Sequence, residues 1–195
     1  MCGHLLLWVH PLEFPEQRKA ALMEIWDLVD LKREVIGQHI RGTEMPPDAY
    51  HQVVHVWIRN AEGKYLMTQR SPMKKTCPLK WECAGGSVLQ GEASLHAALR
   101  EVQEEVGIAL QPGDGRLVLT QVRDYADGVR VNDINDVYLF GYSGGIPLAD
   151  ASTDEVIRAR WASREEIEQL WRIGEMVSGI KDLSYFMDNP DGIFD

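Results

Sequence analysis

The apolar and acidic residues near the middle of the chain predict one helix with two distinct faces. Four apolar residues recur at spacings of four, three and four positions: Leu95, Leu99, Val102 and Val106. At about 100° per residue they form one stripe that faces a core, and Gly107 is expected to end the helix as its C-cap. Glu101, Glu104 and Glu105 crowd a second patch, away from this stripe. Three carboxylates so close repel one another unless water solvates the patch or a divalent cation with oxygen ligands sits on it.

The rest of the chain has patterns that are typical of strands and turns. Two short alternating or apolar runs within residues 24–45 predict a hairpin laid on the main domain. Five later runs read as strands, at residues 51–60, 64–71, 116–127, 137–142 and 154–163. The polar segment 127–136 is predicted to form either a hairpin or a mobile loop over the site near the glutamate-rich helix. Ser163 can cap a helix over SREEIEQLWRI, because Glu166 lies three residues further on.

The acidic composition limits the classes of partner. The chain has 195 residues, 30 acidic and 20 basic, with a formal net charge of −10. This charge argues against nucleic acid and against an anionic membrane surface as partners. The apolar run 5–9 is too short to span a bilayer, so no membrane span is expected. Because no lysine or arginine precedes this run, it also lacks the charged start of a signal peptide.

Length and cysteine content indicate one intracellular domain. We assign residues 23–195 to it, with a core at about 50–171, and leave residues 1–22 unassigned. The three cysteines include no C-x-x-C pair, which predicts a reducing cytoplasm and no structural zinc. A homodimer is left open.

The segment 69–81 concentrates positive charge just before the glutamate-rich helix. It contains Arg70 and Lys74, together with Lys75 and Lys80. Because guanidinium and ammonium groups bind phosphate oxygens, we expect Arg70 and Lys74 to bind a diphosphate. For Lys75 and Lys80, a position as solvated charge on a surface loop is as compatible with the sequence as diphosphate binding.

Two histidines and one cysteine are assigned packing roles. His51 and His55 are four residues apart and share one face of a strand, where a packed histidine is commoner than a metal ligand. Cys83 is expected to act as a small hydrophobic residue.

The stretch from Gly86 to Ile108 resembles the Nudix box. That pattern is a glycine, five residues, a glutamate, seven residues, and then Arg-Glu-apolar-x-Glu-Glu-x-Gly-apolar. Nine positions match it: Gly86, Glu92, Arg100, Glu101, Val102, Glu104, Glu105, Gly107 and Ile108. The resemblance implies an α/β fold, an α/β/α sandwich around a mixed β-sheet, to which the hairpin is a small N-terminal appendage.

The resemblance also implies the site. The implied ligands of Mg²⁺ or Mn²⁺ are three carboxylates and one backbone carbonyl: Glu101, Glu104, Glu105 and Gly85. Glu92 and Arg100 are implied to brace the loops of the box. A further acidic residue from outside the box corresponds to Glu155, with Asp154 as the fallback.

The implied reaction is metal-dependent hydrolysis of a diphosphate linkage in a nucleoside-diphosphate-linked or similar small molecule. The linkage carries charges that repel hydroxide, so held cations must neutralise it and activate the attacking water. A carboxylate not fully occupied by metal can take the proton. Glu104, Glu105 and Glu155 are all candidates for this base.

Two alternatives belong to other classes. Residues 35–81 also resemble the isopentenyl-diphosphate isomerases through His51, Trp57, Asn60, Gly63, Arg70, Lys74, Pro78 and Trp81. Those enzymes need a cysteine before the first box glycine and a histidine after it, where this chain has Gly85 and Ser87. The other alternative is a nucleotide-sensing module without catalysis, against which the intact carboxylate set argues.

Overall fold

The computed structural model of the chain describes residues 24–126 and 129–177. The unassigned extension at residues 1–22 therefore lies outside the described residues. Within them the strands are β1 (Ile25–Val29), β2 (Val35–Ile40), β3 (His51–Arg59), β4 (Tyr65–Arg70), β5 (Trp81–Glu82), β6 (Ala84–Ser87), β7 (Gly115–Ala126), β8 (Val129–Gly141) and β9 (Val156–Ala162). The helices are α1 (Ser94–Val106) and α2 (Arg164–Arg172), with short 3₁₀ turns η1 (Pro112–Asp114) and η2 (Leu148–Asp150).

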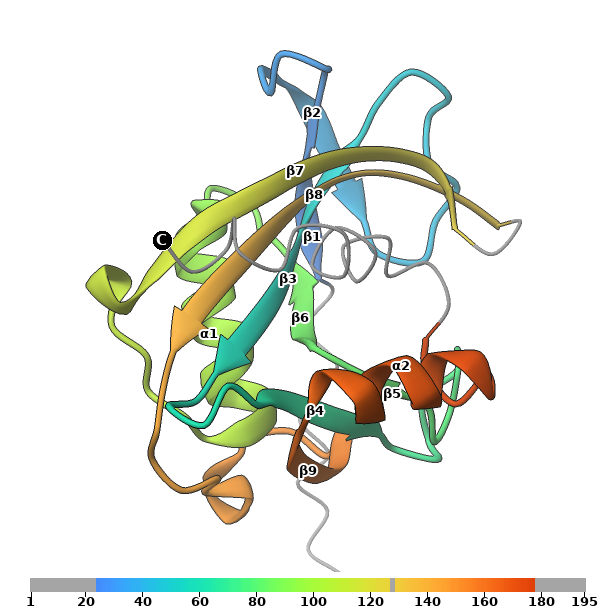
Figure 1. Cartoon of the computed structure of the whole chain (residues 1–195). Helices are drawn as coiled ribbons and strands as arrows, with labels where there is room; N and C mark the ends of the chain where they lie inside the picture. The colour runs from blue at the N-terminus through green and yellow to red at the C-terminus, as the bar shows by residue number, and fades with distance from the viewer. Residues whose placement is uncertain (1–23, 127–128, 178–195) are drawn as a thin grey trace, which may run out of the picture.

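The strands form a small sheet and a large one (Figure 1). Strands β1 and β2 pair antiparallel with each other and make the predicted hairpin. The large sheet has the order β5-β4-β3-β8-β7, to which β6 adds beside β3 and β9 beside β4. Strands β3 and β8 run parallel, whereas the other pairs are antiparallel. The expected mixed sheet is therefore confirmed.

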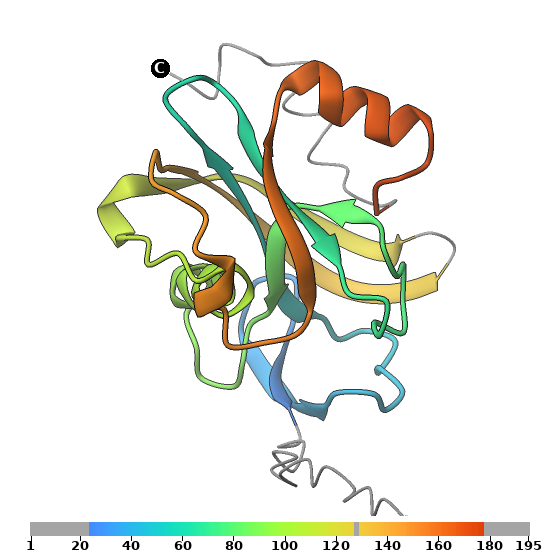
Figure 2. The ribbon, with the colours of Figure 1, turned by 90° about the horizontal axis from the view of Figure 1, so that it is seen from below.

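The two helices cover opposite faces of the large sheet. Figure 2 shows α1 almost end-on beneath the strands, with α2 on the other side of them. The core between α1 and the sheet includes Val54, Ile58 and Phe140, while a second core under α2 includes Trp57 and Met67. This arrangement confirms the α/β/α sandwich.

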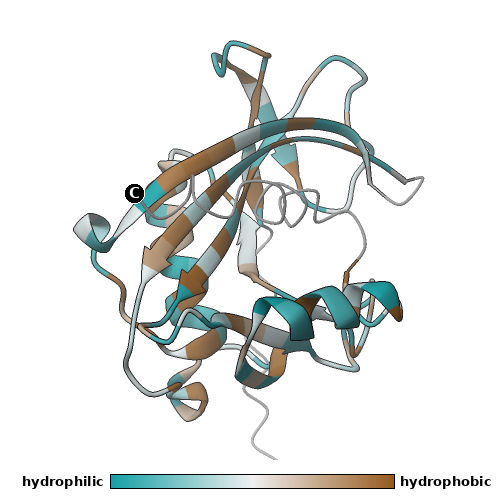
Figure 3. Cartoon of the chain, in the orientation of Figure 1, coloured by the Kyte–Doolittle hydropathy of each residue, from teal (hydrophilic) through white to brown (hydrophobic). Residues whose placement is uncertain are grey.

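The amphipathic pattern of each helix agrees with its place in the sandwich. Figure 3 shows hydrophobic residues along β3 and β8, and a mostly hydrophilic visible face on α2. Of the predicted stripe on α1, Val102 and Val106 are buried, while Leu95 and Leu99 are partly buried against the same core. In the described ranges, no helix is long and apolar enough to cross a membrane.

Both helices end or begin as the sequence predicts. Gly107 adopts the left-handed conformation with φ 77° and donates its N–H to the carbonyl of Gln103, which ends α1. The side chain of Ser163 accepts from the N–H of Glu166, and the Glu166 carboxylate accepts from the N–H of Ser163. This reciprocal capping box begins α2.

The polar segment 127–136 is not a loop in its described part. Residues 129–136 belong to β8, where they pair with β7, so the hairpin alternative is confirmed and the mobile loop over the site is wrong for them. Four polar side chains of this segment are buried, and each has a hydrogen-bond partner: Asn132, Asp133, Asn135 and Asp136. Arg123, for example, donates to the Asp133 carboxylate over 2.6 and 2.8 Å. Such pairing makes a buried polar strand tolerable.

The hairpin is tied to the sandwich by contacts of several kinds. The backbones of Val29 and Tyr50 exchange hydrogen bonds of 2.8 and 2.9 Å. The guanidinium of Arg33 binds both carboxylate oxygens of Asp136, whose side chain is 1% exposed. The Trp26 ring stacks on buried His51, with centroids 4.1 Å apart. The hairpin is therefore a fixed part of the domain, and His51 has the expected packing role.

We predict that His51 makes the fold sensitive to mild acid. Burial lowers the pKa of His51 to about 4, although Asp133 and the Asn132 backbone oppose this shift, and Arg123 and His39 add to it. The unfolded chain, in which a histidine pKa is about 6.5, takes the proton first. Stability contributed by the neutral imidazole is therefore lost as the pH falls from about 6.5 towards 4.

The test compares urea unfolding of the wild type and His51→Gln at neutral pH and at about pH 5. We expect the variant to lose less stability over this interval, by up to about 1.4 kcal/mol per pH unit. His96→Gln, which removes an exposed histidine of α1, serves as the control. An equal fall in the wild type and His51→Gln contradicts the prediction.

Candidate active site

The predicted carboxylates and cations line one cavity of about 560 Å³ between the hairpin, α1 and the loop after β4. The acidic side chains in its lining are Glu24, Glu101, Glu104, Glu105 and Glu155. The basic ones are Arg41, Arg70, Lys74 and Arg100. Arg59 and Arg116 help to line a larger cavity of about 720 Å³, but none of the predicted site residues lines it. The concentration of charge, rather than size, identifies the first cavity as the candidate active site.

Glu105 is the innermost of the glutamates. It is 5% exposed, so the three carboxylates do not form a fully solvated patch, which was one of the two alternatives for this face of α1. The reason is that β6 passes directly over this side of α1: a Cβ added to Gly86 would lie 2.4 Å from Oε1 of Glu101. The N–H of Gly85 donates to Oε2 of Glu105 over 3.2 Å.

Gly85 allows β6 to lie close to β3. Its φ is 155°, and a Cβ there would lie 2.2 Å from the carbonyl oxygen of Val54. A side chain would push β6 away from β3, and with it the backbone that faces Glu105.

The electrostatics of the cavity reflect uncompensated negative charge. Burial, with the nearby carboxylates of Glu82 and Glu101, raises the pKa of Glu105 well above its usual range. Burial also raises the pKa of Glu101, although Arg100 opposes the shift. Glu82, which precedes the box, has its pKa raised by burial against the opposing charge of Arg70.

Arg100 and Glu92 lie together as the resemblance implied. The guanidinium donates from Nε and Nη2 to the two Glu92 oxygens, each over 2.9 Å, and from Nη2 to the carbonyl of Ser87. Its Nη1 donates to Glu101 over 2.8 Å and to Glu104 over 3.2 Å. One side chain thus ties the loop before α1 to two of the acidic residues on the helix.

The two expected phosphate-binding residues lie in the cavity but are engaged with protein groups. Nη1 of Arg70 donates to Glu82 over 2.6 Å, and its Nε donates to the carbonyl of Thr76 over 3.1 Å. The ammonium of Lys74 pairs with the carboxylate of Glu155. An incoming phosphate would have to share both cations with these protein acceptors.

Sequence reasoning missed three charged residues: Glu24 and Arg41, which line the cavity, and Glu82, which lies beside Glu105. The first two belong to the hairpin, and no local pattern connects a hairpin residue with the box. Tertiary contacts make the connection, since Gln90 N–H donates to the carbonyl of Ile25 over 3.0 Å. Glu82 immediately precedes Cys83, which packs in the core under α2 rather than in the lining of the cavity.

The donor set fits a hard divalent cation. All the acidic groups offer oxygen ligands, which Mg²⁺ and Mn²⁺ prefer, and a cation would relieve the repulsion around buried Glu105. In the described part of the chain, no three His, Cys, Asp or Glu side chains converge as a ready-made metal site. Instead, Arg100 holds Glu101 and Glu104, so metal binding requires these two carboxylates to exchange part of that contact for the cation.

Solved structures share this fold. A protein of Deinococcus radiodurans has a TM-score of 0.65 and 23% identity, covering 88% of this chain and 100% of its own. A MutT protein of Methanosarcina mazei Go1 has a TM-score of 0.57 and 25% identity, covering 79% of this chain and 100% of its own.

Sequence comparisons identify the family. An uncharacterized Nudix hydrolase of Listeria monocytogenes is 37% identical over 159 residues, which cover 80% of this chain and 89% of the relative. A second one, from Listeria innocua, is 35% identical with the same coverage. The NUDIX domain model matches residues 49–179, which include the box and most of the cavity. The chain therefore belongs to the Nudix family and is a Nudix hydrolase, an enzyme that acts on phosphorus anhydrides.

Proposed function

We propose that this enzyme hydrolyses a diphosphate linkage in a nucleoside-diphosphate-linked or similar small molecule, with Mg²⁺ or Mn²⁺ as cofactor. The observation that carries the proposal is the position of buried Glu105. It lies beside Glu82 and Glu101, in a cavity that Arg41, Arg70 and Lys74 also line. The carboxylates suit a cation, and the cationic groups suit phosphate oxygens.

We assign some of these residues to holding the cation and others to orienting the diphosphate. Glu101, Glu104 and Glu105, with the carbonyl of Gly85, would hold the cation, which neutralises the phosphates and lowers the pKa of the attacking water when bound. Arg100 and Glu92 keep the helix and its preceding loop in register. Arg70 and Lys74 would orient the diphosphate.

The proton of the attacking water needs an acceptor that water can reach. The side chain of Glu104 is 39% exposed and that of Glu155 is 44% exposed, whereas Glu105 is enclosed. We therefore assign the base to Glu104 or Glu155 and the holding of the cation to Glu105. This assignment narrows the three candidates that the sequence left open.

Activity should depend on a divalent cation, because the carboxylate cluster and the substrate both carry negative charge. We expect EDTA to abolish turnover on the best substrate from a panel of nucleotides, nucleotide sugars, dinucleotides and prenyl diphosphates. Added Mg²⁺ or Mn²⁺ should restore it. Full turnover in metal-free buffer would contradict the proposal, and failure of every substrate to react would favour the sensing module.

Glu105→Gln should lower kcat by about 10²-fold or more with little loss of stability. The amide keeps an oxygen that can accept from Gly85, but it removes the charge that holds the cation and the repulsion from Glu82. Steady-state kinetics and urea unfolding measure the two effects. Glu62→Gln, on an exposed turn, is the control and should match the wild type.

Wild-type turnover by Glu105→Gln would show that the Glu105 carboxylate is not needed for catalysis. An unfolded variant would show that its carboxylate serves the fold instead.

A further inference from the structure

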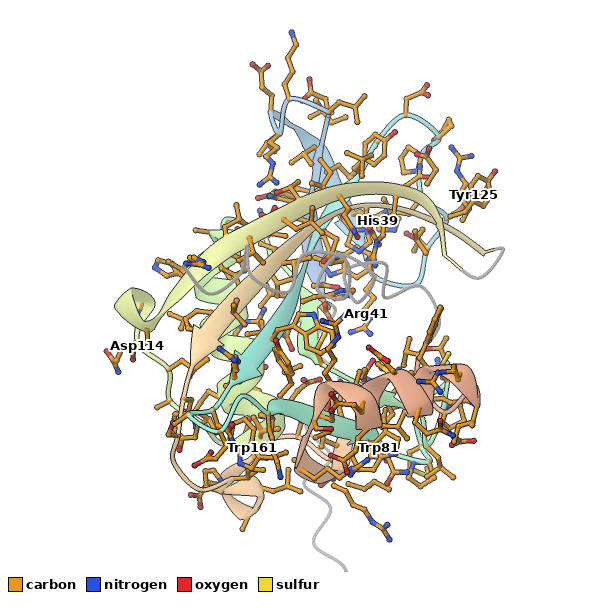
Figure 4. All side chains as sticks on the ribbon, viewed as in Figure 1. His39, Arg41, Trp81, Asp114, Tyr125 and Trp161 are labelled. Atoms are coloured by element: carbon orange, nitrogen blue, oxygen red, sulfur yellow. The ribbon has the colours of Figure 1, made fainter. Side chains whose placement is uncertain are left out.

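The hairpin contributes one cation to the active-site cavity, and this cation comes from outside the box and the loop after β4. Arg41 directly follows β2 and lines the cavity together with Glu101, Glu104 and Glu155. In Figure 4, Arg41 lies below the hairpin and above Trp81 of β5, near the centre of the view. The position of Arg41 is fixed by the backbone, since its N–H donates to the carbonyl of Glu24 over 2.9 Å.

Arg41 differs from the other cations of the cavity in its exposure. The side chain of Arg41 is 54% exposed, compared with 13% for Arg70, 19% for Lys74 and 23% for Arg100. Arg100 and Arg70 each donate to several protein acceptors, whereas the one side-chain hydrogen bond of Arg41 in the described residues is from Nη1 to Glu24. A guanidinium with most of its donors open can bind a phosphate in the planar, two-pronged way that suits this group.

Hydrogen bonds between the hairpin and the loop before α1 place the backbone of Arg41 beside the cavity. Gly91 donates its N–H to Asp27 over 2.7 Å, and Gln90 donates to the carbonyl of Ile25. These bonds join β1 directly to the loop that precedes α1. The hairpin therefore contacts the loop of the box directly beside the cavity.

We propose that Arg41 binds a phosphate oxygen of the substrate, so that the hairpin is a substrate-binding element of the active site. Glu24 holds the guanidinium in place and competes with the substrate for it. The inference deepens the proposed function, because it names the residue that would recognise the phosphate at the hairpin side of the cavity. Arg41 is thus a determinant of KM rather than of the chemical step.

Calorimetric titration with methylenediphosphonate, a diphosphate analogue that cannot be hydrolysed, tests this directly in the presence of Mg²⁺. We expect Arg41→Ala to bind the analogue about tenfold or more weakly than the wild-type full chain does, and Arg41→Lys to lie between them. Lys32→Ala is the matched control, because it removes one exposed positive charge from the turn of the same hairpin. It should bind like the wild type.

Glu24→Gln separates binding from a structural role. If Arg41 only holds the hairpin through its ion pair, Glu24→Gln and Arg41→Ala should weaken binding alike. If Arg41 binds phosphate, removing the competing carboxylate should leave binding of the analogue unchanged or make it tighter. On a reactive substrate, Arg41→Ala should raise KM by a similar factor and leave kcat within about twofold.

The inference is overturned if the wild type does not bind the analogue, if Arg41→Ala binds it as the wild type does, or if Glu24→Gln weakens binding as much as Arg41→Ala. Metal-dependent turnover with an unchanged KM in Arg41→Ala would also reject the role of Arg41, but would leave the proposed function intact. Arg41-dependent binding without turnover of any diphosphate would reject the proposed function instead.

Discussion

The active site depends on the guanidinium of Arg100, which holds like charges together. It reaches the Ser87 carbonyl, both oxygens of Glu92 and the carboxylates of Glu101 and Glu104. Only a planar group with five donors can serve so many acceptors at once. Arg100 therefore does part of the work that a divalent cation would do, and the glutamates can be packed under β6 before any cation binds. The same side chain therefore positions the loop before α1 and partly offsets the negative charge of the site.

The features that the sequence predicts correctly are those with a local or periodic cause. Val102 and Val106 recur at helical spacing and are buried, and Ser163 and Glu166 make the expected capping box. Gly107 ends α1 because a left-handed residue favours glycine. The hairpin follows from two short apolar runs around a turn. The sandwich came from the match to a family pattern, since periodicity alone does not set the order of strands.

The features that the sequence could not predict rest on partners far away along the chain. Asp136 lies in a polar segment for which the sequence left a hairpin and a loop open, and its burial depends on Arg33, which binds it from 103 residues away. Arg41 has no pattern that links it to the glutamates, and only the docking of the hairpin brings it to the cavity. The burial of Glu105 could not be predicted either, because helical periodicity places it away from the apolar stripe and does not show the strand that covers this side of the helix.

The charge balance of the cavity explains how an acidic protein can accept an anionic substrate. Five carboxylates and four cationic side chains line it, which leaves a formal excess of one negative charge. One divalent cation converts this excess into one positive charge, so the cation should favour binding of a diphosphate and the diphosphate should favour binding of the cation. Each lining cation except Arg41 is largely covered and held by protein acceptors. The most exposed positive charge therefore lies on the hairpin side, where it can attract the substrate while the carboxylates on α1 hold the metal.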